Sequence, residues 1–118
     1  MSHYEDLTID QGSDLSVELR LINKDASKKN LTGYSVAAKM APNYTSTDSD
    51  KIAFTAIIAN PDSDGIINLS LTNTQTDALS TRRKYVYDVE ISYVDSDENT
   101  IVERILEGNV TVKPSVTK

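Results

Sequence analysis

Several residue types that often organise small domains are absent or scarce in this sequence. Its 118 residues include no cysteine, no tryptophan and one histidine, His3. Without cysteine the chain can form no disulfide, no thiolate metal site and no cysteine nucleophile. A general base must be held in position by its surroundings, and His3 lies too near the end of the chain for that. No other side chains suggest a nucleophile with its base, so we expect a protein that is not an enzyme.

Long apolar runs and an excess of positive charge are missing too. No run approaches the roughly 20 residues that a membrane helix needs. The first residues lack the basic and apolar regions of a signal peptide, so we expect synthesis in the cytoplasm. Lys and Arg number 12 against 18 Asp and Glu, a net charge of −6, and an acidic domain repels phosphate backbones. We therefore expect neither a membrane nor a nucleic acid as partner.

The clearest pattern that is present is an alternation of residue type along residues 83–94. Its odd positions carry Tyr85, Tyr87, Val89, Ile91 and Tyr93, whereas the even positions are mostly polar or charged. A period of two residues, in types that pack well on a pleated surface, predicts a strand with one face in the core. We expect this to be the central strand around which the rest of the chain is built.

Turn-rich segments separate this strand from others of similar length. The further predicted strands span residues 7–9, 15–22, 35–40, 52–58, 66–71 and 101–112. Residues 52–58 and 66–71 flank the turn signal at 60–65, which predicts a hairpin. In the last strand the alternation slips, and because glycine in a strand often marks a bulge, we expect one at Gly108.

One segment between the strands has a helical signature. Thr72 or Asn73 would act as N-cap, and the residues that follow favour one or two helical turns with Leu79 as an apolar plug. We expect this short helix to bridge two sheets. Strands about ten residues apart, each bounded by turns, are typical of a sandwich or barrel.

The fold expected from these patterns is all-β. We predict an immunoglobulin-like antiparallel β-sandwich of about seven strands with one short helix, in a single domain spanning residues 1–113. Pro114 would end the last strand and leave residues 114–118 as a C-terminal tail. The cysteine and tryptophan landmarks of antibody domains are absent, so the likeness is one of architecture.

Three pairs of aspartates have the spacing that could gather a hard cation such as calcium. They are Asp48/Asp50, Asp62/Asp64 and Asp95/Asp97. None extends into a complete calcium-binding loop, and aspartate is itself a good turn residue because it bonds its own backbone. We expect turn chemistry at all three pairs, and neither a metal ion nor a cofactor.

The longest predicted loop spans residues 42–50 and contains one large apolar residue, Tyr44. Such loops are either mobile in solvent or in contact with a partner, and the sequence leaves both readings open. If the loop binds, the candidate contact residues are Asn43, Tyr44, Thr45, Ser46, Thr47 and Asp48.

Four segments in this order and spacing resemble a known family. They are residues 9–15, 31–36, 85–90 and 106–112, the last followed by Pro114. The family comprises small proteins of tailed bacteriophages and prophages, usually encoded among virion structural genes. In strand plan the chain also resembles the amino-terminal immunoglobulin-like domain of baseplate upper proteins. The likeness covers nearly the whole chain, but the positions that match are ones that a fold needs, so no functional residue transfers.

The resemblance implies a structural, non-enzymatic component of a tailed-phage virion. The tail or baseplate is the expected place, with the neck or head as alternatives. The expected partners are other virion structural proteins, with several copies of the chain in each particle. A function of another class, a carbohydrate- or host-surface-binding module, remains the alternative, and it would also use the loop around Tyr44.

Overall fold

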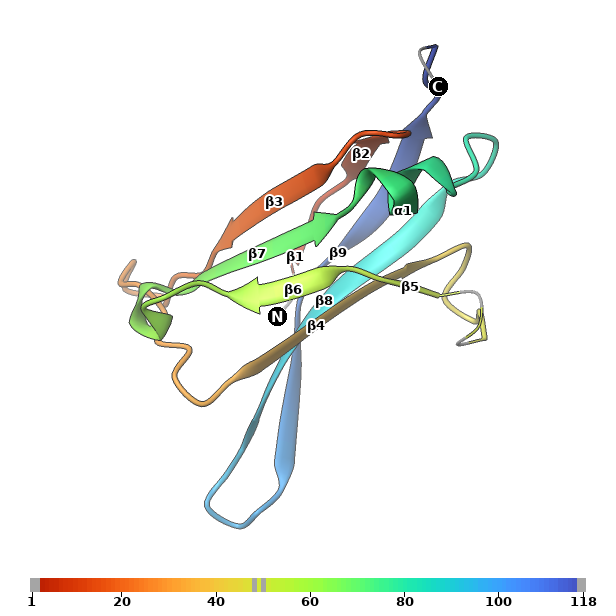
Figure 1. Ribbon diagram of the computed structural model, residues 1–118. Coiled ribbons are helices and arrows are strands. Elements are labelled where there is room, and N and C mark those ends of the chain that lie inside the picture. Colours follow the sequence, from red (N-terminus) through yellow and green to blue (C-terminus); the bar gives the residue numbers. More distant parts are fainter. Residues whose placement is uncertain (1–2, 48, 50, 117–118) are drawn as a thin grey trace.

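Two β-sheets packed face to face make up most of the molecule in the computed structural model, which describes residues 3–47, 49 and 51–116 (Figure 1). A short α-helix and the 3-10 helix η2 (Asp62–Asp64) lie in connections between the strands. No helix among these residues is both long and apolar enough to cross a membrane. The predicted all-β sandwich with one short α-helix is therefore confirmed.

The larger sheet contains six strands. They are β1 (His3–Tyr4), β2 (Leu7–Asp10), β4 (Ser35–Ala41), β5 (Ile52–Ala53), β8 (Tyr85–Val94) and β9 (Thr100–Lys113). The strand order is β1-β9-β8-β4-β5, and β2 also pairs with β9. The strand predicted to be central is central, since β8 pairs with β9 on one side and with β4 on the other.

The smaller sheet contains three strands in the order β3-β7-β6. They are β3 (Leu15–Arg20), β6 (Thr55–Ile58) and β7 (Ile66–Leu71). Both sheets turn one face inward, and the alternation seen in the sequence sets which residues are buried. Val89 and Ile91 of β8, and Ile67 and Leu69 of β7, are all fully buried.

The expectation of a purely antiparallel sandwich is wrong at one edge. β1 and β2 both run parallel to β9, with Leu7 beside Val110 and Ile9 beside Val112. The first strand therefore joins the larger sheet next to the last strand. Ile9 is fully buried in consequence.

The segment at residues 52–58 is two strands rather than one. Ile52–Ala53 (β5) pairs with β4 in the larger sheet, whereas Thr55–Ile58 (β6) pairs with β7 in the smaller one. Phe54 stands between them, and its buried ring lies 6.3 Å from that of Tyr87, centroid to centroid. The predicted hairpin is thus correct for β6 alone. The chain passes from the larger sheet to the smaller one at Phe54, and because this residue is buried, the sequence stays apolar where the chain changes sheet.

The bulge in β9 lies three residues before the predicted position. Val89 stands opposite Leu106 and Glu90 opposite Arg104, which leaves Ile105 without an opposite residue. Gly108 has another role. A Cβ added there would lie 1.9 Å from the carbonyl oxygen of Glu5, so glycine is needed because the chain between β1 and β2 passes directly over it.

The predicted helix connects the two sheets as expected. α1 (Asn73–Asp77) follows β7 of the smaller sheet and precedes β8 of the larger one. Thr72 is its N-cap and forms a capping box with Gln75, in which each side chain bonds the backbone N–H of the other residue. Leu79 is buried, as predicted for the apolar plug.

Candidate functional site

The face of the larger sheet that points away from the core carries small and charged side chains. In neighbouring strands β4 and β8, the outward-facing residues stand in register as Ala37 with Glu90, Lys39 with Asp88, and Ala41 with Val86. The inward-facing residues between them, such as Met40 and Val89, are buried. The alternation that builds the core thus also sets this outer row.

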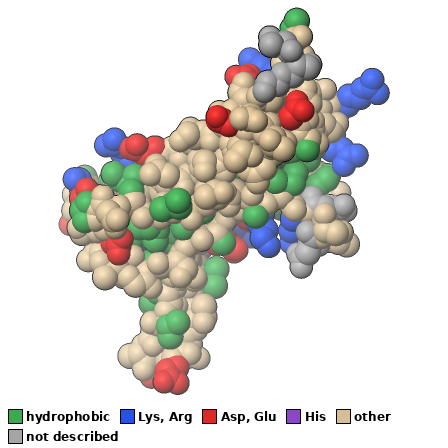
Figure 2. Space-filling model, in the orientation of Figure 1, with side chains coloured by type: hydrophobic (Ala, Val, Ile, Leu, Met, Phe, Trp, Pro, Cys, Tyr) green, Lys and Arg blue, Asp and Glu red, His purple; other side chains and the backbone are tan. Residues whose placement is uncertain are grey.

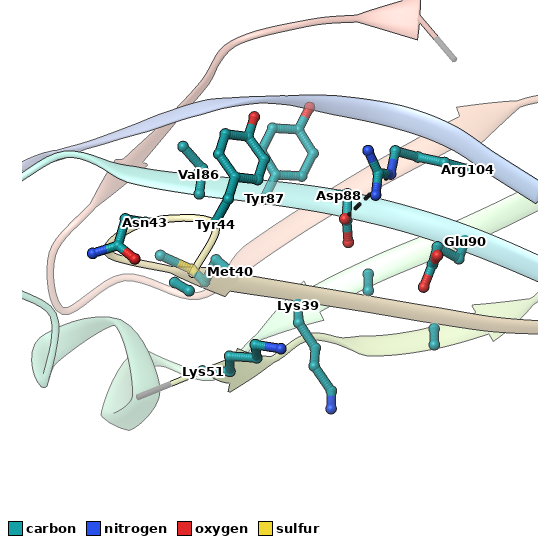
Figure 3. A pocket seen from close by; sticks show the side chains of 13 residues that line it. Lys39, Met40, Asn43, Tyr44, Lys51, Val86, Tyr87, Asp88, Glu90 and Arg104 are labelled. Atoms are coloured by element: carbon teal, nitrogen blue, oxygen red, sulfur yellow. Dashed lines mark ion pairs between the residues drawn. The ribbon is translucent and has the colours of Figure 1, made fainter. Parts of the chain in front are cut away.

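A hollow of about 470 Å³ lies on this outer face, and we call it the outer-face hollow (Figure 3). Ala37 and Ala41 contribute side chains of one methyl group each to its lining, which leaves space between their larger neighbours. In Figure 3, Tyr44 and Val86 lie at one end of the hollow, and Glu90 and Arg104 lie at the other. The hollow forms because the small side chains of Ala37 and Ala41 in β4 lie among longer charged side chains.

The loop after β4 forms one wall of the hollow. The side-chain oxygen of Asn43 accepts hydrogen bonds from the Thr45 N–H at 3.1 Å and from the hydroxyls of Thr45 and Ser46. These bonds fix the turn that presents Tyr44, whose side chain is 61% exposed. Ala41 faces outward yet is buried, because the loop folds back over the end of its strand.

The charged lining contains both signs. Arg104 Nε lies 3.4 Å from a carboxylate oxygen of Asp88, and Arg104 is also the residue opposite Glu90 in the sheet. Lys39 and Lys51 add two further cations. Three cations and two carboxylates therefore line a hollow in a chain whose net charge is −6, so the site is more positive than the molecule as a whole.

A second exposed tyrosine lies close to the first. Tyr4 is 63% exposed, and its hydroxyl accepts a hydrogen bond of 2.7 Å from the side-chain amide of Asn109. Reduced hydration and then the charge of Asp6 raise the pKa of Tyr4 above its ordinary value, and Tyr44 is near enough to contribute. The two tyrosines therefore occupy the same outer region of the larger sheet.

The inner side of the same sheet fixes the N-terminal strands. The Tyr87 hydroxyl donates a hydrogen bond of 2.6 Å to the Glu5 carbonyl, directly above Gly108. Burial, followed by the nearby charges of Glu5 and Asp6, raises the pKa of Tyr87 to about 12. Because Glu5 directly follows Tyr4, this contact also holds the exposed Tyr4 in place.

The predicted contact residues are only partly brought together. Asn43 and Tyr44 line the hollow, Thr45 and Ser46 complete the turn beside them, and Thr47 follows. Asp48 lies outside the described residues. Sequence reasoning missed the strand residues of the site, namely Lys39, Asp88, Glu90 and Arg104. Their signal was the polar half of the alternation, which we interpreted as a solvated face.

Two of the three aspartate pairs can be described. A side-chain oxygen of Asp95 accepts the N–H groups of Asp97 and Asn99, each at 2.9 Å, which is the expected turn chemistry. Asp62 and Asp64 belong to η2, where Asp64 pairs with Lys28 at 3.6 Å. Asp48 and Asp50 fall outside the described residues. Within residues 3–47, 49 and 51–116, no three His, Cys, Asp or Glu residues are grouped as a metal site would need.

Comparisons with known proteins bear on the fold alone. No family model matches the sequence, and no curated protein does so either. Among solved structures, that of murine CRIg aligns over 92% of this chain and 92% of its own, with a TM-score of 0.51 and 14% sequence identity. CRIg is an immunoglobulin-like domain. The chain described here is accordingly an immunoglobulin-like β-sandwich.

Proposed function

We propose that this protein is a structural module of a tailed-phage virion and that it belongs to the tail or baseplate. It acts by contact with other virion proteins and catalyses no reaction. The likeness of its sequence segments to small phage structural proteins supports a place in the virion. The exposed outer face of the larger sheet supports the mode of action.

The observation that carries the proposal is the exposed tyrosine at the rim of the outer-face hollow. Tyr44 is 61% exposed on a turn that three hydrogen bonds to Asn43 hold in shape. Tyrosine is enriched in the cores of protein interfaces, because it offers a large rigid surface at a low cost in conformational entropy. A preformed turn also lowers the cost of ordering the loop on binding. This arrangement favours a contact loop over a solvent loop.

The test is incorporation into particles. A phage that lacks the gene is supplied with the wild-type chain or with Tyr44→Ser, and the copies of the protein in purified particles are counted by mass spectrometry. Ile57→Ser is the matched control, since Ile57 is 57% exposed on β6 of the other sheet. We expect wild type and the Ile57 variant to be incorporated equally, and the Tyr44 variant to be depleted by about tenfold. Particles that never contain the protein would refute the structural role.

A second candidate function is carbohydrate or host-surface binding. Tyr44 lines the same hollow as the polar groups of Asn43, Asp88 and Glu90, and an aromatic ring with a few polar groups also suits a small ligand. A glycan array probed with the isolated domain distinguishes the two. Saturable binding that Tyr44→Ser removes, together with normal particles in the absence of the protein, would favour this second function.

A further inference from the structure

The hairpin of β8 and β9 extends beyond the sandwich as a narrow finger (Figure 1). The last residue of β8 that pairs with β4 is Ser92, opposite Ser35. Beyond it, Tyr93 and Val94 pair with β9 alone. The loop at the end of this finger, residues 95–99, connects β8 to β9, and we call it the hairpin tip.

The hairpin tip is acidic, and no basic residue in the described part of the chain forms an ion pair with it. Asp95 shapes the turn through its bonds to backbone N–H groups. The side chains of Asp97 and Glu98 are exposed and form no ion pair with any residue that the structure describes. Figure 2 shows acidic side chains at this extremity of the molecule. The tip therefore presents a compact negative charge.

The opposite end of β8 carries the opposite charge. Val86, near the start of the strand, lines the outer-face hollow with its excess of cations. Arg82, Arg83 and Lys84, which directly precede the strand, are exposed and likewise unpaired within the described chain. At a rise of about 3.4 Å per residue, Val86 and Val94 are roughly 27 Å apart. The two charged regions therefore cannot meet within one molecule.

We propose that the hairpin tip of one copy docks in the outer-face hollow of a second copy. This inference rests on the proposed function, because it uses the same face as the contact surface and names the partner. The tip is a protrusion and the hollow is a recess, so their shapes as well as their charges are complementary. Complementary charges guide association and select the orientation.

Exposed apolar side chains beside the tip support a protein partner. Val94 and Val102 are 64% and 54% exposed and lie on the outer face of the finger. Docking of the finger near Tyr44 would remove this apolar surface from water, which stabilises the contact. Because the two surfaces differ, the contact is head-to-tail and repeats from copy to copy, as a ring or a filament. Such a repeat fits a module present in several copies.

The experiment is sedimentation velocity of the full chain at high protein concentration, in low and in high salt. Two charge-reversal variants are compared with wild type, a tip variant (Asp97→Lys/Glu98→Lys) and a hollow variant (Lys39→Glu/Lys51→Glu). A control, Lys24→Glu/Lys113→Glu, changes the charge by as much as the hollow variant at exposed positions outside the hollow. Thermal unfolding of each variant verifies that it is folded.

We expect wild type and the control to associate at low salt and to dissociate as salt screens the charges. Each reversal variant alone should associate at least about tenfold more weakly, and an equal mixture of the two should associate again, because their reversed surfaces are complementary. A steric variant, Ala37→Tyr, fills the hollow without altering charge and should also weaken association. A monomeric wild type at low salt, or a mixture that fails to associate, would overturn the inference. Particle incorporation that depends on Tyr44 would then still support the proposed function.

Discussion

The position of the N-terminal strands depends on three residues that are far apart in the sequence. Gly108 allows the backbone of Glu5 to approach β9, and the hydroxyl of Tyr87 donates to the Glu5 carbonyl from the neighbouring strand. Glycine here serves close approach, whereas the glycines of turns serve backbone conformation. The sequence predicted a special role for Gly108 but assigned the wrong one, because the residue that it accommodates lies about a hundred positions away.

Tyr87→Phe tests this contact through pH. The raised pKa means that the folded state holds the phenolic proton more tightly than the unfolded state, where the pKa is near 10. The contribution of Tyr87 to stability is therefore present below pH 10 and is lost as the pH rises through about 12. At neutral pH we expect Tyr87→Phe to lower the free energy of unfolding by about 1 kcal/mol.

Urea unfolding at several pH values measures the difference between the two proteins. The difference in free energy of unfolding between wild type and Tyr87→Phe should become smaller as the pH rises from 10 to 12. Tyr93→Phe is the control for the loss of a hydroxyl at neutral pH, because the Tyr93 hydroxyl makes no hydrogen bond within the described residues, and it should lower the free energy of unfolding by less than Tyr87→Phe does. A constant difference for Tyr87→Phe would contradict the assigned hydrogen bond.

Gly108→Ala tests the close approach itself. The added methyl group would overlap the Glu5 carbonyl, so the N-terminal chain must move away, at a cost of about 2 kcal/mol or more. Gly33→Ala is the comparison, since a Cβ added there would meet no atom within 4 Å beyond its chain neighbours, and the cost comes from a φ of 83°, about 1 kcal/mol. Hydrogen exchange reports the difference: the Glu5 amide, which bonds the Glu107 carbonyl, should exchange faster in Gly108→Ala alone.

At the scale of elements, the two sheets are joined by the contact between α1 and the turn after β2. Thr76 is the buried polar residue of the described core, and its hydroxyl donates to the Ser13 carbonyl at 2.8 Å and accepts from the Gly12 N–H at 3.0 Å. Asp14 accepts the backbone N–H of Asn73 at the start of the helix. Helix and turn therefore satisfy each other's backbone groups.

Thr76→Val removes the hydroxyl and keeps the shape of the side chain. The buried N–H of Gly12 and the partly buried carbonyl of Ser13 would lose their partner, so we expect a loss of about 1–3 kcal/mol in the free energy of unfolding. Thr74→Val, on the exposed side of the same helix, should cost about 0.5 kcal/mol or less. Equal midpoints in thermal unfolding of the two variants would show that the helix is not held through Thr76.

Local patterns allowed most elements to be predicted from the sequence. Alternation located β8, β3 and β7, and the Thr72 cap located α1, because these signals depend on neighbours in the chain. The division of residues 52–58 between two sheets could not be read in this way. Both halves place partly buried apolar residues against the core, and the choice of sheet at Phe54 depends on partners distant in sequence. The parallel pairing of β2 with β9 was missed for the same reason.

The whole molecule measures 49 × 28 × 22 Å along its principal axes, and its long dimension suits a module with contacts at different places. The candidate site was only half predictable from the sequence. The loop with Tyr44 stood out by length and composition, whereas the alanines and charged residues of β4 and β8 had no signal until the register placed them together. Surface sites that cross strands depend on register, which local patterns do not specify.

The measurement that tests the central claim most directly is the accessibility of the outer face within intact particles. Because the chain has no cysteine, a single introduced thiol reports one position. Ala37→Cys places it in the outer-face hollow, and Ser16→Cys places it on the exposed side of β3 in the other sheet. Both thiols should react with a maleimide at similar rates in the isolated domain. In purified particles we predict that the thiol at position 37 is protected at least tenfold, by rough estimate, while the thiol at position 16 reacts as before. Equal reactivity of the two thiols in particles, or protection of position 16 alone, would contradict the account.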